Sequence, residues 1–116
     1  MAESIIKGGT KKLANSSITP ASGTIYSNRS AKFGNLVVLD ITLKDASFSS
    51  GGVLFATITD EEFKPSSGSN PSVWARKQHL AFGDGWVDQN GKISVRFTAS
   101  QSGYISIFTV YAVNVS

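Results

Sequence analysis

Alternation between hydrophobic and polar residues is the clearest pattern in this chain. From residue 35 to residue 44, every second position is aliphatic: Val37, Leu39, Ile41 and Leu43. The same two-residue period returns in residues 92–98, where the apolar positions are Ile93, Val95 and Phe97. Successive side chains of an extended strand point to opposite faces, so both segments are predicted to be β-strands with one face in the core.

Two further segments are apolar on both faces. They are residues 53–59 (VLFATIT) and residues 104–115 (YISIFTVYAVNV). Since neither face of such a strand suits water, both are predicted to lie in the middle of a sheet or at an interface. Residues 23–33 and 73–82 are also rich in β-forming residues and are predicted to be extended.

Turn-rich segments separate these strands. Residues 45–52 and 100–103 are polar turns, and the loop at residues 60–72 holds two of the three prolines. Asn90-Gly91 is a strong hairpin signal because both residues accept a positive φ angle. With no helical period in the chain, the pattern predicts an all-β fold: an antiparallel β-sandwich or jelly-roll-like head of six to eight strands.

The first 22 residues are predicted to form a short N-terminal arm or connector. Lys, Gly, Ser and Asn dominate there, and apolar residues are scattered. Residues 23–116 then form a single head domain, because a chain of 116 residues is too short for two cores. Strands that are apolar on both faces need more cover than one thin sandwich provides, which favours burial against other copies in a closed homo-oligomer.

Composition narrows the possible partners. Charged residues make up 16% of the chain, against about 25% in typical soluble domains. The net charge is +3, but Lys7, Lys11 and Lys12 are clustered near the start, which disfavours nucleic-acid binding by a basic face.

There is no cysteine to form disulfides. The chain lacks a membrane-spanning apolar run and a signal-peptide core, so we expect synthesis in a cytoplasm and no membrane insertion.

Metal and catalytic chemistry find little support in the sequence. A calcium loop of the EF-hand type that begins at Asp84 would have Gln89 where glycine is required. Residues 60–62 are consecutive acids whose side chains diverge, as expected of a solvated loop. His79 is the only histidine, and a structural or surface role is favoured over ligand contact or catalysis. Paired carboxylates stay open, since pairing is spatial, but we predict no enzyme activity, no metal and no cofactor.

Ligand binding is the remaining chemical possibility. Trp74 follows a long loop and Trp86 precedes the hairpin at residues 88–91, and loops at the ends of a sandwich often carry binding residues. Their rings could stack on sugar rings, as could those of Tyr26 and Tyr104, whereas core packing is favoured for Tyr111. The candidate ligand-binding residues are Trp74, Arg76, Asp84, Trp86, Asp88 and Asn90, with Gln78 as a further hydrogen-bonding group.

Three segments together resemble the C-terminal head domain of phage tail-fibre, baseplate and receptor-binding proteins. They are KFGNLVVLDITLKD, GGVLFATITDEEFKPSS and GWVDQNGKISVRFTASQSGYISIFTVYAV, and the resemblance covers about residues 23–115. These motifs are turn and strand signatures, so they indicate architecture more than chemistry. The resemblance implies a first hairpin at Lys32, Gly34 and Asn35, an anchored loop at Phe63 and Pro65, and a second hairpin at Asp88, Asn90 and Gly91.

The resemblance also implies a location and a role. We expect a virion protein of the tail tip, baseplate or head fibre whose homotrimeric head binds a host cell-surface polysaccharide without catalysis. Its arm would contact other virion proteins. The alternative is a structural accessory virion protein, such as a head fibre, capsid decoration or baseplate adaptor, without its own ligand; a small polysaccharide-degrading domain is disfavoured.

The position of the two tryptophans discriminates between adhesion and a purely structural role. Exposure of Trp74 and Trp86 in a groove distal to the arm favours adhesion, and Trp86→Ala should then abolish attachment while the trimer stays intact. Burial of these rings, or a position on a threefold axis, favours the accessory protein.

Overall fold

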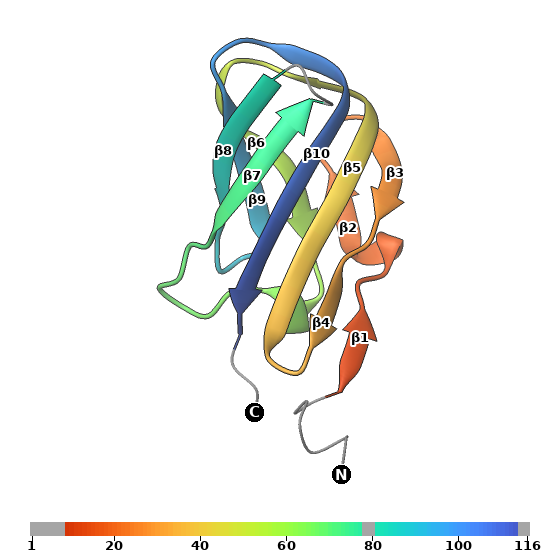
Figure 1. Ribbon diagram of the computed structural model, residues 1–116, viewed down its shortest axis with the longest axis vertical. Helices are drawn as coiled ribbons and strands as arrows, with labels where there is room; N and C mark the ends of the chain where they lie inside the picture. Colours follow the sequence, from red (N-terminus) through yellow and green to blue (C-terminus); the bar gives the residue numbers. More distant parts are fainter. Residues whose placement is uncertain (1–8, 78–80, 114–116) are drawn as a thin grey trace.

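The computed structural model describes residues 9–77 and 81–113, which form an antiparallel β-sheet curled into two layers (Figure 1). The predicted all-β antiparallel sandwich is confirmed. The structure has more strands than the six to eight expected. The additional ones include strands of only three residues, which are too short to be predicted from the sequence pattern. The strands are β1 (Thr10–Lys12), β2 (Ile18–Pro20), β3 (Thr24–Asn28), β4 (Ala31–Phe33), β5 (Leu36–Phe48), β6 (Gly51–Ile58), β7 (Ser72–Lys77), β8 (Ala81–Val87), β9 (Lys92–Phe97) and β10 (Gln101–Ala112). In the described part of the chain, helix is limited to two 3-10 turns, Asn15–Ser17 and Glu61–Phe63.

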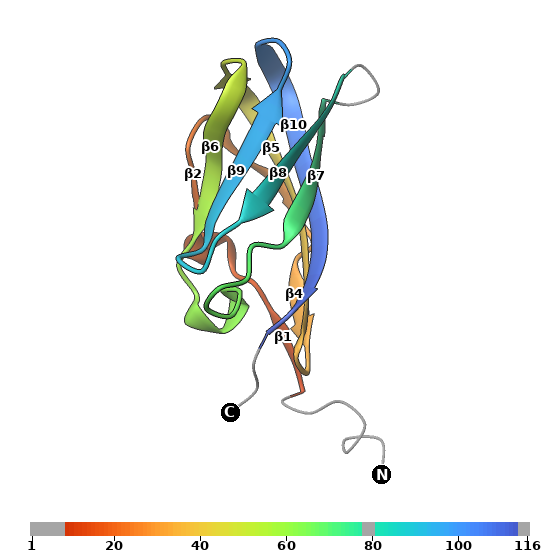
Figure 2. The ribbon, with the colours of Figure 1, turned by 90° about the vertical axis from the view of Figure 1, so that its left-hand side faces the viewer.

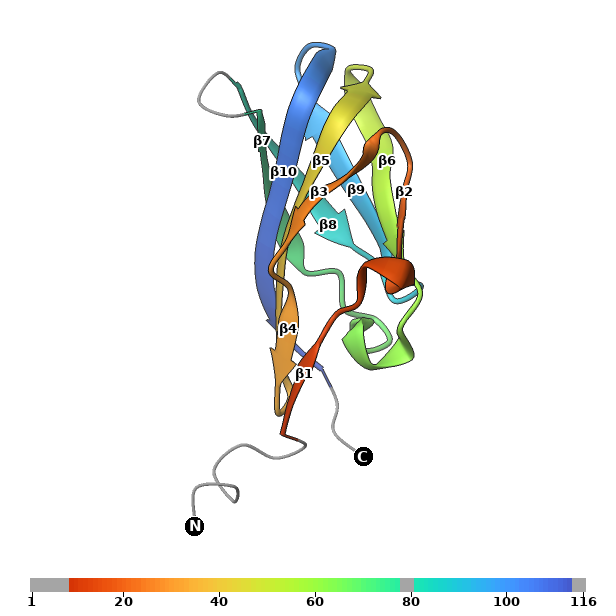
Figure 3. The ribbon, with the colours of Figure 1, turned by 90° about the vertical axis from the view of Figure 1, so that its right-hand side faces the viewer.

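The strand order explains how one sheet makes two layers. It runs β1-β4-β5-β10-β7-β8-β9-β6-β2, and β3 pairs with β5 beside β4. Figures 2 and 3 show β5, β10 and β7 in one layer and β9, β6 and β2 in the other, with β8 joining them. The two long central strands, β5 and β10, pair along almost their whole lengths. The outer face of this β5–β10 layer carries the site described below.

The core lies between the layers and follows the alternation seen in the sequence. All four aliphatic residues of the β5 pattern and all three apolar residues of the β9 pattern are buried. Tyr111 is also buried, as expected, and its hydroxyl donates a hydrogen bond to the carbonyl oxygen of Phe63. Phe63 and Pro65 are themselves buried, so the loop after β6 is anchored at this point.

The structure differs from the expected arm over residues 9–22, which lie on the sandwich. β1 pairs with β4, and β2 extends the second layer by pairing with β6. Leu13 and Ile18 are buried in the core. Strands of three residues are too short to show a period, so they could not be predicted from alternation. Residues 1–8 of the predicted arm lie outside the described residues.

Strand β5 continues through residues predicted as a turn. The segment from residue 45 was expected to leave the sheet, but β5 extends to Phe48. A β-bulge makes this possible: Asp45 has a φ of 54°, and Lys44 and Asp45 together lie opposite Tyr104. The chain reverses only at residues 49–50, so the polar character of the segment reflects a bulged strand near its end.

Both predicted hairpin turns are present. Phe33 pairs with Leu36 across the turn at Gly34 and Asn35, and β8 returns as β9 across residues 88–91. In the second turn the Asp88 carboxylate accepts hydrogen bonds from the backbone N–H groups of Asn90 and Lys92. Within this turn the positive φ occurs at Gly91 and not at Asn90.

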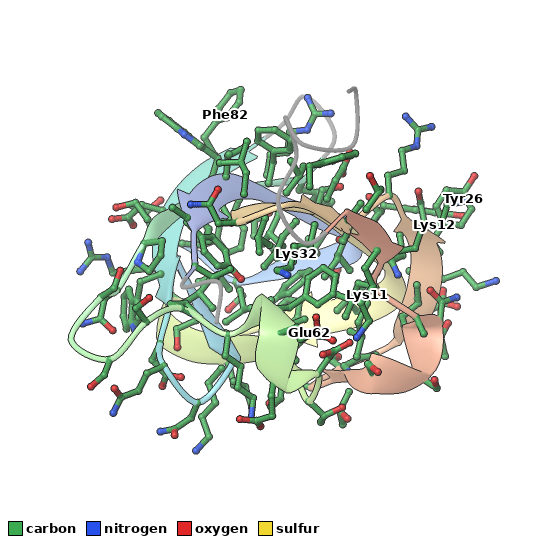
Figure 4. All side chains as sticks on the ribbon, turned by 90° about the horizontal axis from the view of Figure 1, so that it is seen from below. Lys11, Lys12, Tyr26, Lys32, Glu62 and Phe82 are labelled. Atoms are coloured by element: carbon green, nitrogen blue, oxygen red, sulfur yellow. The ribbon has the colours of Figure 1, made fainter. Side chains whose placement is uncertain are left out.

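A cluster of charges closes one end of the sandwich (Figure 4). Lys11 Nζ lies 3.0 Å from an Asp60 carboxylate oxygen and 2.5 Å from Glu62 Oε2, and Lys32 Nζ lies 3.7 Å from Glu62 Oε1. The hydrogen bond from Lys11 lowers the pKa of the Glu62 carboxyl. Two of the three acids in residues 60–62 therefore converge on an ammonium group, whereas the sequence suggested that they diverge into solvent.

Candidate functional site

An aromatic groove crosses the outer face of the β5–β10 layer. Its volume is about 510 Å³, which lies within the range of small-molecule sites in proteins. Strands β3, β5, β10, β7 and β8 all contribute. The lining residues are Tyr26, Ser27, Arg29, Asp40, Thr42, Trp74, Ala75, Arg76, Phe82, Ser106, Ile107 and Phe108.

The floor of the groove comes from β5 and β10. Asp40 and Thr42 alternate with buried aliphatic residues of β5 and therefore face outward. In the paired strand, Phe108 lies opposite Asp40 and Ser106 lies opposite Thr42. The Thr42 and Ser106 hydroxyl oxygens are 2.8 Å apart and share a hydrogen bond. The floor thus places an aromatic ring beside a carboxylate and a pair of hydroxyls.

One wall of the groove comes from β7 and β8. Trp74 pairs with Phe108, and Arg76 lies in register between Ser106 of β10 and Phe82 of β8. The rings of Trp74 and Phe82 are 73% and 72% exposed, unusually high for large aromatic residues in a folded domain. These two rings form a ridge that stands free in solvent.

Glycines on the inner face of β8 set the position of this wall. A Cβ atom on Gly85 would lie 2.0 Å from the Ser94 carbonyl oxygen, and one on Gly83 would lie 2.6 Å from the Arg96 carbonyl oxygen. Side chains at these positions would push β8 away from β9. The alternation of the FGDGW segment thus places glycine inward and Phe82 outward.

The opposite wall comes from β3 and the bend that follows it. The Asn28 side chain donates to the Leu13 carbonyl oxygen at 2.7 Å and accepts from Ser30 N–H. Arg29 lies between Asn28 and Ser30 in the sequence. Its backbone N–H donates to the Asp40 carbonyl oxygen at 2.8 Å, and its side chain is exposed. Tyr26 stands on the same side, 60% exposed. Viewed along the long axis, Tyr26 and Phe82 lie well apart, on opposite walls of the groove that both line (Figure 4).

A smaller hollow continues the groove along β10. Its volume is about 360 Å³, and it is lined by Tyr26, Thr42, Arg76, Tyr104 and Ser106. The ring of Tyr104 meets that of Tyr26 edge to face, with their centroids 4.9 Å apart. We call this space the Arg76 hollow, since Arg76 is the one charged residue among those that line it.

Of the six predicted ligand-binding residues, Trp74 and Arg76 line the groove. Asp84 lies beyond the ridge, in a separate hollow of about 510 Å³. There the Arg96 guanidinium binds its two carboxylate oxygens at 2.7 and 3.2 Å. The hydrogen bonds from Arg96 lower the pKa of the Asp84 carboxyl.

The other predicted residues lie away from the groove. Trp86 is 37% exposed and lies beside Gly52 of β6, a strand of the other layer. Asp88 and Asn90 belong to the β8–β9 turn, where the Asp88 carboxylate caps backbone N–H groups. Gln78 and His79 lie outside the described residues, so their predicted roles stay predictions.

Several lining residues were missed from the sequence, among them Arg29, Asp40, Thr42, Phe82, Ser106 and Phe108. A signal existed for two of them: Asp40 and Thr42 occupy the polar face of the clearest strand. Phe108 was also visible on the outward face of β10, but that strand was interpreted as lying in the middle of a sheet or at an interface. The missing information was that β10 lies between β5 and β7.

The groove combines several aromatic residues with few ionisable groups. Asp40 is the one carboxylate among its described lining residues. Among residues 9–77 and 81–113, no group of three His, Cys, Asp or Glu side chains is placed to hold a metal ion. Nor does that part of the chain include a helix long and apolar enough to cross a membrane.

The chain was compared with protein-family models, with curated proteins and with solved structures, and none of these comparisons found a match.

Proposed function

We propose that this chain is a non-catalytic, saccharide-binding head of a phage virion protein. The groove carries the proposal, because exposed aromatic rings surround its polar groups. These rings belong to Tyr26, Trp74, Phe82 and Phe108. A sugar ring has apolar C–H faces and hydroxyl edges. The faces pack on aromatic rings, while Asp40, Thr42 and Ser106 bond the hydroxyls. Such a mixture of apolar lining and a few placed polar groups is typical of small-molecule sites.

The acidic residues favour binding over cleavage. Glycoside hydrolysis commonly uses two carboxyl groups on either side of the scissile bond, and the described lining of the groove supplies Asp40 alone. Asp84 lies across the Trp74–Phe82 ridge and is bound to Arg96. Because this contact lowers its pKa, Asp84 is ionised at neutral pH and unsuited to donate a proton.

The virion location and the homotrimer are supported by the resemblance of the strand and turn segments to phage receptor-binding heads. The accessory, ligand-free role remains a second candidate, and one observation favours it. Leu36, Val110 and Phe108 form an exposed apolar row along the same outer face. An apolar row of this kind is often covered by another subunit.

Binding of the labelled protein to a panel of intact bacterial cells tests the proposal. We expect saturable binding to some strains, competed by polysaccharide extracted from the same cells. Light scattering on the same sample should give a mass near three chains. Trp74→Ala should remove cell binding and leave the mass unchanged, because the ring is exposed on the groove wall.

Trp86→Ala is the matched control. Trp86 lies outside the groove, so its loss should leave cell binding intact, contrary to the expectation drawn from the sequence. A stable oligomer that binds no strain would support the accessory role. Loss of the oligomer in Trp74→Ala would show that this face is an interface between subunits and would contradict the saccharide site.

A further inference from the structure

We propose that the Arg76 hollow binds an anionic substituent of the saccharide, either a carboxylate or a phosphodiester. This inference rests on the proposed function and names the chemical class of the ligand. The hollow is one end of the groove, so a sugar chain lying on Phe108 and Trp74 would bring a substituent next to Arg76.

The lining of the hollow is a set of hydrogen-bond donors without a carboxylate. Arg76 provides a guanidinium group, and the remaining described residues each provide a hydroxyl: Tyr26, Thr42, Tyr104 and Ser106. Hydroxyl groups can donate to an anionic oxygen, although the Thr42–Ser106 pair uses one of its two protons in its own hydrogen bond. A guanidinium presents two parallel N–H groups to a carboxylate or phosphate. A neutral sugar hydroxyl would use this donor set less fully than an anion does.

The charge of Arg76 is not neutralised within the described residues. The ion pairs of the described chain involve Lys11, Lys32, Lys64 and Arg96. Neither Arg76 nor Arg29 takes part in one. Across the whole groove, two guanidinium groups therefore stand against the single carboxylate of Asp40. An anionic ligand would complete the charge balance.

Asp40 determines where the anion lies. Arg29 lines the groove together with Asp40, and its backbone N–H bonds the Asp40 carbonyl oxygen, so an anion near Arg29 would also be repelled by the carboxylate. Arg76 is separated from β5 by strand β10 and pairs with Ser106, two residues along β10 from the Phe108–Asp40 pair. Asp40 does not line the Arg76 hollow. Anion binding is therefore expected at Arg76, and Arg29 contributes only to the surrounding field.

Direct titration of the full chain with matched saccharides tests this inference. The probes are an oligogalacturonate, its neutral methyl ester and a glycerol-phosphate polymer, each at low and high salt. We expect at least one anionic probe to bind roughly tenfold or more tightly than the ester, since a hydrogen bond to a charged group contributes more free energy than one to a neutral group. The preference should weaken in high salt, and comparison of the two anionic probes distinguishes carboxylate from phosphodiester.

Three variants complete the test. Arg76→Gln should remove the preference for the anionic probe, Arg76→Lys should restore part of it, and Arg29→Gln should keep most of it. Equal binding of the anionic and neutral probes would overturn the inference and leave a neutral saccharide site. A preference that survives in Arg76→Gln would also overturn it, because the anion would then bind away from Arg76. If no saccharide binds and Trp74→Ala leaves cell attachment unchanged, the proposed function itself fails.

Discussion

The Tyr111 hydroxyl joins the last strand to the loop that follows β6. It donates to the carbonyl oxygen of Phe63, and both side chains are buried. Burial also raises the pKa of the Tyr111 hydroxyl above its ordinary value of 10.0. At neutral pH the hydroxyl therefore stays protonated and keeps its bond, which fixes the loop against the core.

Removal of this hydroxyl gives a pH-dependent prediction. At pH 8, Tyr111→Phe should lower the free energy of unfolding by about 1 kcal/mol, because the Phe63 carbonyl loses its partner. Above pH 10 the unfolded wild-type chain ionises at Tyr111 before the folded one does, so the unfolded state binds fewer protons. The wild type then loses stability that the variant keeps, by about 1.4 kcal/mol at pH 11.

Urea denaturation of both proteins at pH 8 and pH 11 measures this difference. The advantage of the wild type should vanish or reverse at the higher pH. Other groups that titrate in this range are common to both proteins and cancel in the comparison. A constant advantage at both pH values would mean that the folded and unfolded Tyr111 hydroxyls ionise alike.

Gly85 gives a second prediction at the residue scale. An added Cβ would lie 2.0 Å from the Ser94 carbonyl oxygen and 2.9 Å from Val73 Cγ2. Gly85→Ala should therefore lower the free energy of unfolding by about 1–3 kcal/mol through overpacking. Gly52→Ala is the control, because its Cβ would meet nothing closer than Trp86 Cη2 at 3.8 Å. Thermal unfolding that shows equal effects would contradict the close approach of β8 to β9.

At the scale of the strand, predictability depended on length. The alternation in β5 and β9 was enough to identify those strands and their buried faces, since several consecutive residues repeat the period. β1, β2 and β4 have three residues each and show no period. Their place in the sheet depends on partners far along the chain, such as β6 for β2. For this reason a packed segment was interpreted as an arm.

Leu13 tests whether this segment is an integral part of the fold. The side chain is 3% exposed, so Leu13→Ala should lower the free energy of unfolding by about 2–5 kcal/mol. Lys11→Met removes the ion pairs with Asp60 and Glu62 but leaves an exposed position, and its effect should be much smaller. Urea denaturation measures both. A Leu13→Ala protein as stable as the wild type would mean that this segment contributes little to the core.

At the scale of the whole molecule, the groove is a product of topology. Tyr26, Phe82 and Phe108 come from distant parts of the sequence and line one groove because β10 lies between β5 and β7. Sequence reasoning found Trp74 and Arg76 by residue type and loop position. It could not place Phe82 or Phe108 beside them, because strand order is a long-range property that local alternation does not determine.

The positions of the two described chain ends have a mechanical consequence. Gly9 accepts a hydrogen bond from Gly34, and Val113 donates one to Asn35, so both ends leave beside the same turn at one end of the long axis (Figure 1). A pull on the groove against either end acts roughly along β5 and β10. Force in that direction shears the long ladder between them and loads its hydrogen bonds together instead of unzipping them one at a time. The groove thus lies on two strands whose ladder resists tension in shear.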